Sequence, residues 1–104
     1  MTLTREFRTT LLVRAQRDAD FRRAILKEGI DTLLAGDVNT GKAILRDYIN
    51  AAVGFAELAD AIHIPAKSLM RMFGPKGNPR ADNLFNVIQH LQDREGIRLE
   101  VTQR

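Results

Sequence analysis

The sequence contains no cysteine, no tryptophan and no long apolar run. The absence of cysteine excludes a disulfide scaffold and any zinc site built from thiolates. No apolar stretch approaches the roughly 20 residues that a membrane-spanning helix needs. The N-terminal segment MTLTREFRTT lacks the apolar core of a signal peptide. We therefore expect a cytoplasmic protein that does not bind membranes.

The residue patterns of an enzyme are missing as well. No nucleophile–base pair, no paired catalytic carboxylates and no oxyanion motif can be identified. His63 and His90 are far apart in the chain, with no Asp or Glu at ligand spacing. Asp93 and Glu95, which flank an arginine, have the pattern of ordinary surface charges. We expect no catalytic activity, no cofactor and no metal.

The composition is that of an ordinary globular protein, with 44% hydrophobic and 28% charged residues. A length of 104 residues fits one domain. Sixteen basic against 13 acidic residues give a net charge of +3, which permits a polyanionic partner without requiring one. Cations are densest in residues 67–80, which contain no acidic residue and hold Lys67, Arg71, Lys76 and Arg80.

Hydrophobic spacing predicts an all-α fold of five to six helices. The predicted helices cover residues 4–16, 19–35, 37–52, 55–62, 65–73 and 81–94, and a strand remains an alternative in part of the first. Asp18 and Asp37 are predicted N-caps, and Gly36 and Gly96 are predicted helix stops. In the last helix we expect Phe85 to point inward with Leu84, Ile88 and Leu91.

Residues 97–102 alternate strictly between apolar and polar side chains, which predicts a short C-terminal β-strand with one apolar face. A lone strand leaves its backbone hydrogen-bonding groups unpaired. The strand must therefore pair with residues 4–12 of its own chain or with the same strand of a second chain. We favour the second arrangement, which produces a two-fold homodimer.

The most informative segment is FAELADAIHIPAKSLMRMFGPKGNP, residues 55–79. Its two short helices are separated by the tight turn 63–65 and have the apolar spacing that lets them cross and share one core. The outer face of the second helix is then free of core residues and carries Ala66, Lys67, Met70 and Arg71. A solvated surface would explain these side chains, but a cationic exposed helix also fits the major groove of double-stranded DNA.

This segment resembles the helix-turn-helix of the lambda-repressor/Cro-like family over residues 38–92. The matching positions are Leu58, Ala59, Ile62, Ile64, Ser68, Leu69, Met72 and Pro79. The sequence departs from the family at His63, where the family has a turn glycine, and it lacks the glutamine that opens the motif. The resemblance implies a lambda-repressor-like DNA-binding fold in which the loop after the second helix approaches the phosphate backbone. It makes Lys76, Asn78 and Arg80 candidate phosphate contacts.

A narrower resemblance covers nearly the whole chain. The string K-S-L-x-R-M-x-G-x-x-G-N-P, read here at residues 67–79, is similar to the addiction-module antidote group of HigA-like antitoxins. This resemblance implies a RelE/HigB-like ribonuclease toxin as partner and repression of a shared promoter. We accordingly expect an N-terminal helical extension over 1–36, a helix-turn-helix domain over 37–95 with its motif at 55–73, and a C-terminal strand within 96–104.

Two alternatives remain open at this point. The protein could mask a toxin without reading DNA, or it could be a stand-alone phage-type regulator without a toxin. Steep salt dependence of DNA binding separates the first alternative from a repressor, because phosphate contacts release counterions. The neighbouring open reading frame separates the second.

Overall fold

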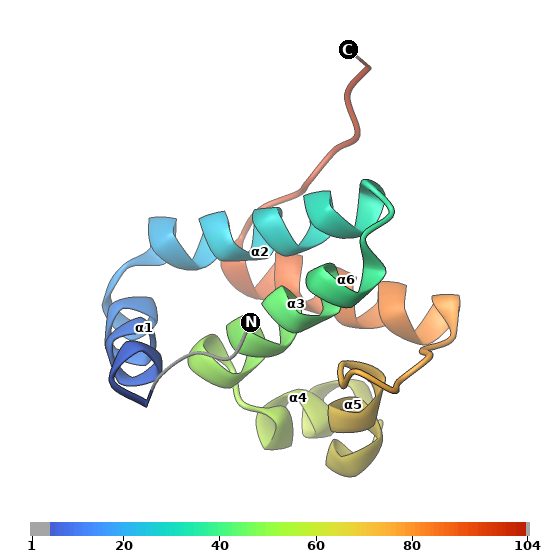
Figure 1. Ribbon diagram of the computed structural model, residues 1–104, viewed down its shortest axis with the longest axis horizontal. Coiled ribbons are helices and arrows are strands. Elements are labelled where there is room, and N and C mark those ends of the chain that lie inside the picture. The colour runs from blue at the N-terminus through green and yellow to red at the C-terminus, as the bar shows by residue number, and fades with distance from the viewer. Residues whose placement is uncertain (1–4, 104) are drawn as a thin grey trace.

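The computed structural model describes residues 5–103, except the side chain of Arg8, and its regular structure within that range is entirely helical (Figure 1). The helices are α1 Arg5–Arg17, α2 Ala19–Leu34, α3 Val38–Ala52, α4 Phe55–Ile62, α5 Ala66–Met72 and α6 Ala81–Glu95. The all-α prediction is confirmed, and the strand alternative within residues 5–16 is wrong. Residues 1–4 and 104, the outermost parts of the predicted extension and strand, lie outside the described residues.

The helix boundaries follow local capping chemistry. Asp18 accepts a hydrogen bond from the Phe21 N–H at 3.0 Å, which satisfies an unpaired amide at the start of α2. Asp37 does the same for Thr40 at 3.3 Å at the start of α3. Gly96 ends α6 in the left-handed region, with φ 68°. These predicted caps and the predicted stop at Gly96 are confirmed.

Helices α2 and α3 approach each other closely because both carry a glycine at the contact. A Cβ placed on Gly29 of α2 would lie 2.8 Å from Leu45 Cδ2, and one on Gly41 of α3 would lie 2.7 Å from Leu33 Cδ2. Either added carbon would overlap a leucine of the facing helix, which would have to shift within a closely packed core. The two glycines therefore allow the close approach of α3, which crosses the middle of the molecule, and α2, which lies above it in Figure 1.

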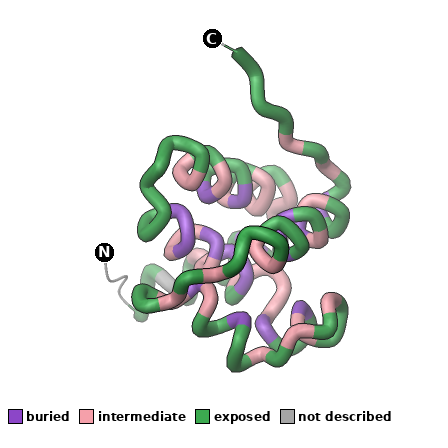
Figure 2. Tube along the Cα trace, turned by 90° about the vertical axis from the view of Figure 1, so that its right-hand side faces the viewer, coloured by how far each residue is buried: buried purple, intermediate pink, exposed green. Residues whose placement is uncertain are grey.

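One hydrophobic core joins five of the helices. Its fully or almost fully buried members are Leu26, Leu45, Tyr48, Ile49, Phe55, Leu58, Leu69, Phe73, Val87 and Leu91. Figure 2 shows buried residues on the inward sides of these helices. Leu26 belongs to the predicted N-terminal extension, yet it lies in the same core as α4 and α5. α4 and α5 thus pack on a frame made by α2, α3 and α6.

The exposure of Phe85 corrects one prediction. Its side chain is 61% exposed, although the sequence placed it inward. The buried or half-buried positions of α6 are 83, 84, 87, 88, 90, 91, 92 and 95. At roughly 100° per residue, position 85 lies about a third of a turn from the centre of this set. Hydrophobicity alone therefore misassigned a residue that the helix geometry turns to the surface.

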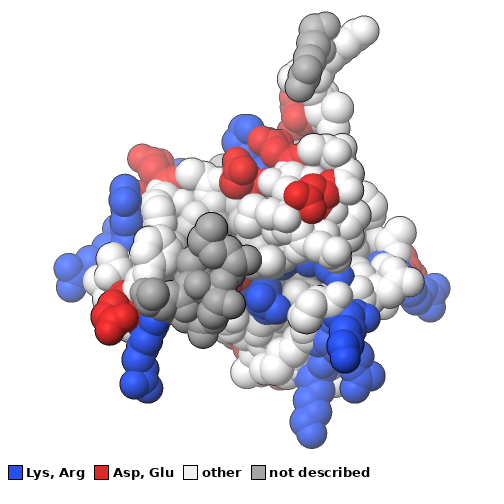
Figure 3. All heavy atoms as spheres, in the orientation of Figure 1, with Lys and Arg blue, Asp and Glu red and all other residues white. Residues whose placement is uncertain are grey.

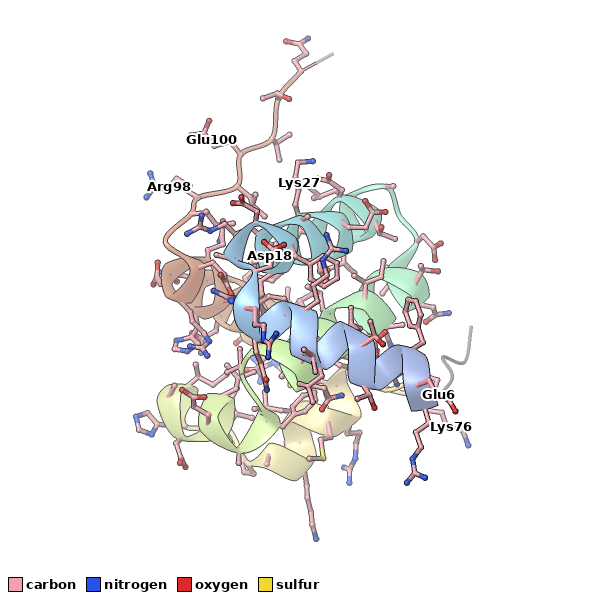
Figure 4. All side chains as sticks on the ribbon, turned by 90° about the vertical axis from the view of Figure 1, so that its left-hand side faces the viewer. Glu6, Asp18, Lys27, Lys76, Arg98 and Glu100 are labelled. Carbon is pink, nitrogen blue, oxygen red and sulfur yellow. The ribbon has the colours of Figure 1, made fainter. Side chains whose placement is uncertain are left out.

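The C-terminal residues do not form the expected strand within this single chain. Residues 97–103 are extended without strand pairing to any described residue, and the tail leaves the helical body with Arg98 and Glu100 on it (Figure 4). Ile97 packs against the core, and the Leu99 N–H donates to Gln92 Oε1 at 2.7 Å. Pairing with residues 5–12 is wrong, because they are helical. Pairing across a two-fold axis stays a prediction.

A buried carboxylate joins three helices. Glu95 of α6 is 4% exposed, although the sequence suggested a surface charge, and this interpretation is wrong. Arg22 Nε of α2 donates to Glu95 Oε2 at 3.0 Å, and the Tyr48 hydroxyl of α3 donates to the same oxygen at 2.5 Å. Arg22 also donates to the Ala15 carbonyl of α1 at 2.7 Å. An ion pair and a hydrogen bond compensate the burial of the charge.

The environment of Tyr48 predicts a pH dependence. Burial raises the pKa of its phenol above the ordinary value of about 10, and the hydrogen bond to Glu95 raises the pKa further. The folded protein holds this proton more tightly than the unfolded chain, so Tyr48 contributes full stability below pH of about 10 and loses it as the pH rises. We expect tyrosinate absorbance to appear only together with loss of the helical circular dichroism signal.

The measurement is specific because Tyr48 is the only tyrosine of the chain. The Tyr48→Phe variant is the control, and its stability should fall less steeply above pH of about 10 because one titrating group is gone. Ionisation of Tyr48 at its ordinary pKa in a protein that keeps its full helical signal would contradict the burial of the hydroxyl.

Candidate nucleic-acid interface

Helices α4 and α5 form two arms joined by the turn 63–65. α4 begins after Gly54, which has φ 90°, and ends at His63, whose φ of 59° and ψ of 40° are left-handed. The His63 N–H donates to the Ala59 carbonyl at 2.9 Å and closes the last turn of α4. Pro65 then directs the chain into α5 with ψ 140°. The turn predicted from the sequence is present, and its first residue occupies a conformation that favours glycine.

The inner face of the motif is held by four buried side chains. Leu58 of α4 and Leu69 of α5 are fully buried, and Phe55 and Phe73 lie at the two ends of the motif. The rings of Phe55 and Phe73 are 6.5 Å apart between centroids with planes inclined at 50°, a favourable aromatic arrangement. The predicted core position of Leu69 is confirmed. These contacts fix which face of α5 remains outside.

The outer face of α5 presents most of the predicted base-contacting residues to solvent. Lys67, Met70 and Arg71 are exposed, with Met70 at 51%. Ala66 is half-buried and lines a shallow hollow together with Asp60 and other residues of α4 and the turn. The structure therefore brings a cation, a thioether and a guanidinium together on one short helix. Ser68, which the site prediction omitted, is also exposed.

The loop after α5 places the predicted phosphate contacts beside the end of that helix. Lys76, Asn78 and Arg80 are exposed, and Arg80 pairs with Asp82 at 3.3 Å. A Cβ on Gly77 would lie 1.9 Å from the Arg71 carbonyl oxygen, so only glycine lets the loop press against the last turn of α5. The loop and the exposed face of α5 thus form one continuous surface.

Cations predominate on this surface. No acidic residue occurs between Asp60 and Asp82, and this interval carries four cations. Among the ion pairs within the described residues, only the one at Arg80 involves any of these four. Figure 3 shows cationic side chains at the lower right, on the side of α5 and the loop, and also at the left, on the side of α1; most of the acidic side chains visible in this view lie near the top. Such a surface attracts a polyanion.

A buried lysine behind the loop was missed by the sequence analysis. Lys42 of α3 is 3% exposed, and its Nζ donates to the Gly74 carbonyl at 3.1 Å and to the Gly77 carbonyl at 2.6 Å. Its signal in the sequence is its position: Lys42 stands three residues before Leu45 and seven before Ile49, on the apolar face of the helix. A lysine at a core position indicates a buried partner for its ammonium.

The two histidines, distant in the sequence, line one shallow hollow between α4 and α6. His63 is at the end of α4, and His90 and Asp93 are on α6. Within the described part of the chain, no group of three or more His, Asp or Glu is arranged to hold a metal ion.

None of the described helices is long and apolar enough to cross a membrane.

Comparison of the chain with models of known protein families, with curated proteins and with solved structures gave no match. The functional assignment therefore rests on the residues and geometry of this chain. The geometry defines an all-α protein with two crossed short helices, a cationic outer face on the second and a glycine-dependent loop beside it.

The left-handed turn residue yields a stability prediction. A non-glycine residue in this region costs about 1–2 kcal/mol, whereas glycine costs about 0.5–1 kcal/mol in additional unfolded-state entropy. We expect His63→Gly to raise the free energy of unfolding by roughly 0.5–1 kcal/mol, measured by urea denaturation. His63→Ala keeps the Cβ and should give no such gain. Equal effects of the two substitutions would show that backbone strain at this turn is not relieved.

Proposed function

We propose that the protein is a sequence-specific DNA-binding repressor that inserts α5 into the major groove of its operator. The observation that carries this proposal is that α5 has one buried apolar face and one exposed cationic face. Leu69 is fully buried against the core, while Lys67 and Arg71 on the same seven-residue helix are exposed. A rigidly held helix with a free cationic face has the size and charge to enter the groove.

The residue chemistry supports a division of roles on this surface. Arg71 can donate two hydrogen bonds to guanine, and Lys67 can donate to the same acceptor edge. Met70 and Ala66 offer apolar contact to a thymine methyl group. Lys76, Asn78 and Arg80 in and beside the loop supply the phosphate contacts that fix register on the duplex. Base readout and backbone attachment then come from adjacent segments of the chain.

The proposed binding unit is a homodimer. A helix of seven residues reads few base pairs, and repressors with this motif place two such helices in half-sites about 34–36 Å apart. The extended tail offers the means of association, because its alternating apolar side chains have no partner strand among the described residues. The N–H groups of Ile97 and Leu99 already donate to Gln92. Pairing of residues 97–102 across a two-fold axis would satisfy the other backbone groups of this segment.

We further propose that the repressor is the cytoplasmic antitoxin of a type II toxin–antitoxin module. Support for this part comes from the resemblance of residues 67–79 to HigA-like antitoxins, which implies a RelE/HigB-like toxin and repression of the shared promoter. The experiment that tests the repressor is binding to the DNA upstream of its own reading frame at several salt concentrations. A repressor shows affinity that falls steeply with salt, whereas a protein that only masks a toxin shows weak binding to any DNA sequence.

Arg71→Ala tests the base contact. We expect operator binding to weaken by roughly 1–3 kcal/mol per half-site, and by twice that in a symmetric dimer. The melting temperature should stay unchanged because the Arg71 side chain is exposed. Arg17→Ala, which removes the same charge from exposed α1, is the matched control and should bind like the parent. Equal affinity of the Arg71 and Arg17 variants would refute the assignment of α5 as the reading helix.

Val101→Asp tests the dimer. Val101 is 80% exposed in the single chain, so the substitution leaves the fold of one copy intact. We expect light scattering to show a weaker dimer for Val101→Asp than for Thr102→Asp, whose side chain points to the opposite face of an extended chain. A Val101→Asp dimer as tight as the parent would eliminate the strand contact, and a monomeric parent would eliminate the dimer.

A further inference from the structure

The ammonium of Lys42 is the main polar link between α3 and the loop that follows α5. The two carbonyl oxygens that it contacts belong to Gly74 and Gly77, which are 32 and 35 residues away in the sequence. Both are backbone atoms, so the lysine holds the path of the loop itself rather than a side chain. Lys76 stands between these two anchored residues and is exposed.

Burial makes these two hydrogen bonds consequential. Lys42 is 3% exposed, and a buried ammonium is expensive unless it is hydrogen-bonded. Hydrogen bonds from a charged donor are about twice as strong as neutral ones. The loop cannot move away without leaving a buried cation unpaired, so the ammonium resists any opening of the loop.

Packing alone does not hold the loop against α3. A hollow of about 110 Å³ separates them, lined by Asn39, Ala43 and Arg46 from α3 and by Phe73, Gly74 and Pro75 from the other side. On its opposite side the loop is tight: the Cβ of any residue replacing Gly77 would lie 1.9 Å from the Arg71 carbonyl oxygen. The loop is thus pressed on the end of α5 and tied to α3 by Lys42.

We propose that Lys42 is a positioning residue for DNA binding. Its ammonium fixes the loop 74–80 so that Lys76 and Asn78 meet the phosphate backbone in register with Arg71 on α5. Lys42 itself does not touch DNA, because its Nζ is buried and engaged with the loop carbonyls. This inference rests on the proposed function and adds to it a residue that acts from behind the binding surface.

A double-mutant cycle on the full chain tests the inference. Operator affinity is measured over a range of salt for the parent, Lys42→Met, Lys76→Ala and the double variant. In the parent, Lys76→Ala should weaken binding several-fold and reduce the salt slope by about 1. In the Lys42→Met background, Lys76→Ala should change neither quantity further, because the loop is no longer held in place.

Lys27→Met is the matched control. Lys27 is an exposed lysine of α2 that pairs with Asp31, and it lies at the opposite end of the molecule from Lys76 (Figure 4). The Lys27→Met variant loses the same charge as Lys42→Met, and it should leave both the operator affinity and the effect of Lys76→Ala on that affinity unchanged. If Lys76→Ala weakens binding by the same factor in the parent and in Lys42→Met, the positioning role is overturned while the proposed function stands.

A second variant covers the case in which Lys42→Met does not fold. Gly77→Ala retains Lys42 but displaces the loop from the end of α5, so it should also remove the effect of Lys76→Ala on binding. Additive effects of Gly77→Ala and Lys76→Ala would overturn the inference. A parent protein that does not bind its upstream DNA would instead overturn the proposed function, and this result is obtained before any variant is compared.

Discussion

Glu95 is an acidic side chain that is only 4% exposed, and its ion pair with Arg22 and its hydrogen bond from Tyr48 compensate this burial. Removal of one partner of such a buried pair is far more damaging than the pair is stabilising, because it leaves a charge without compensation. The three side chains come from α2, α3 and α6, the helices that support the others. Their relative placement is therefore specified by polar contacts as well as by apolar packing. The positions of α4 and α5 depend on this frame, because both helices pack against it.

α3 connects the buried carboxylate with the candidate interface. Tyr48 near its C-terminal end contacts the buried carboxylate, and Lys42, about 9 Å earlier along the helix axis, contacts the loop beside α5. α3 thus contributes both the tyrosine that donates to the Glu95 carboxylate and the buried lysine that donates to the loop. The outer surface that bears Lys67 and Arg71 contains few contacts that could hold it in shape, and its order derives from the residues behind it.

The sequence predicted those features that depend on near neighbours. Asp18 and Asp37 predicted where α2 and α3 begin. The apolar spacing around Leu58 and Leu69 predicted that α4 and α5 cross and that one face of α5 is exposed. The apolar face of α3 indicates that Lys42 is buried, but the partners of Lys42 and Glu95 could not be predicted, because they lie as far as 35 and 73 residues away. Phe85 was misassigned for a related reason: periodicity identifies an apolar side chain or face but not whether anything covers it. For the same reason, the alternation at 97–102 does not show what the predicted strand pairs with. Contact with DNA remains a proposal.

α5 is so short that its stability depends on the core against which it packs. An isolated helix of seven residues is unstable in water, and Leu69 and Phe73 belong to the same core as Leu26 and Leu91. Because these two side chains belong to the core, unfolding of α5 also opens the core. Under the proposed function, the fraction of the protein that can bind DNA then follows its folded fraction.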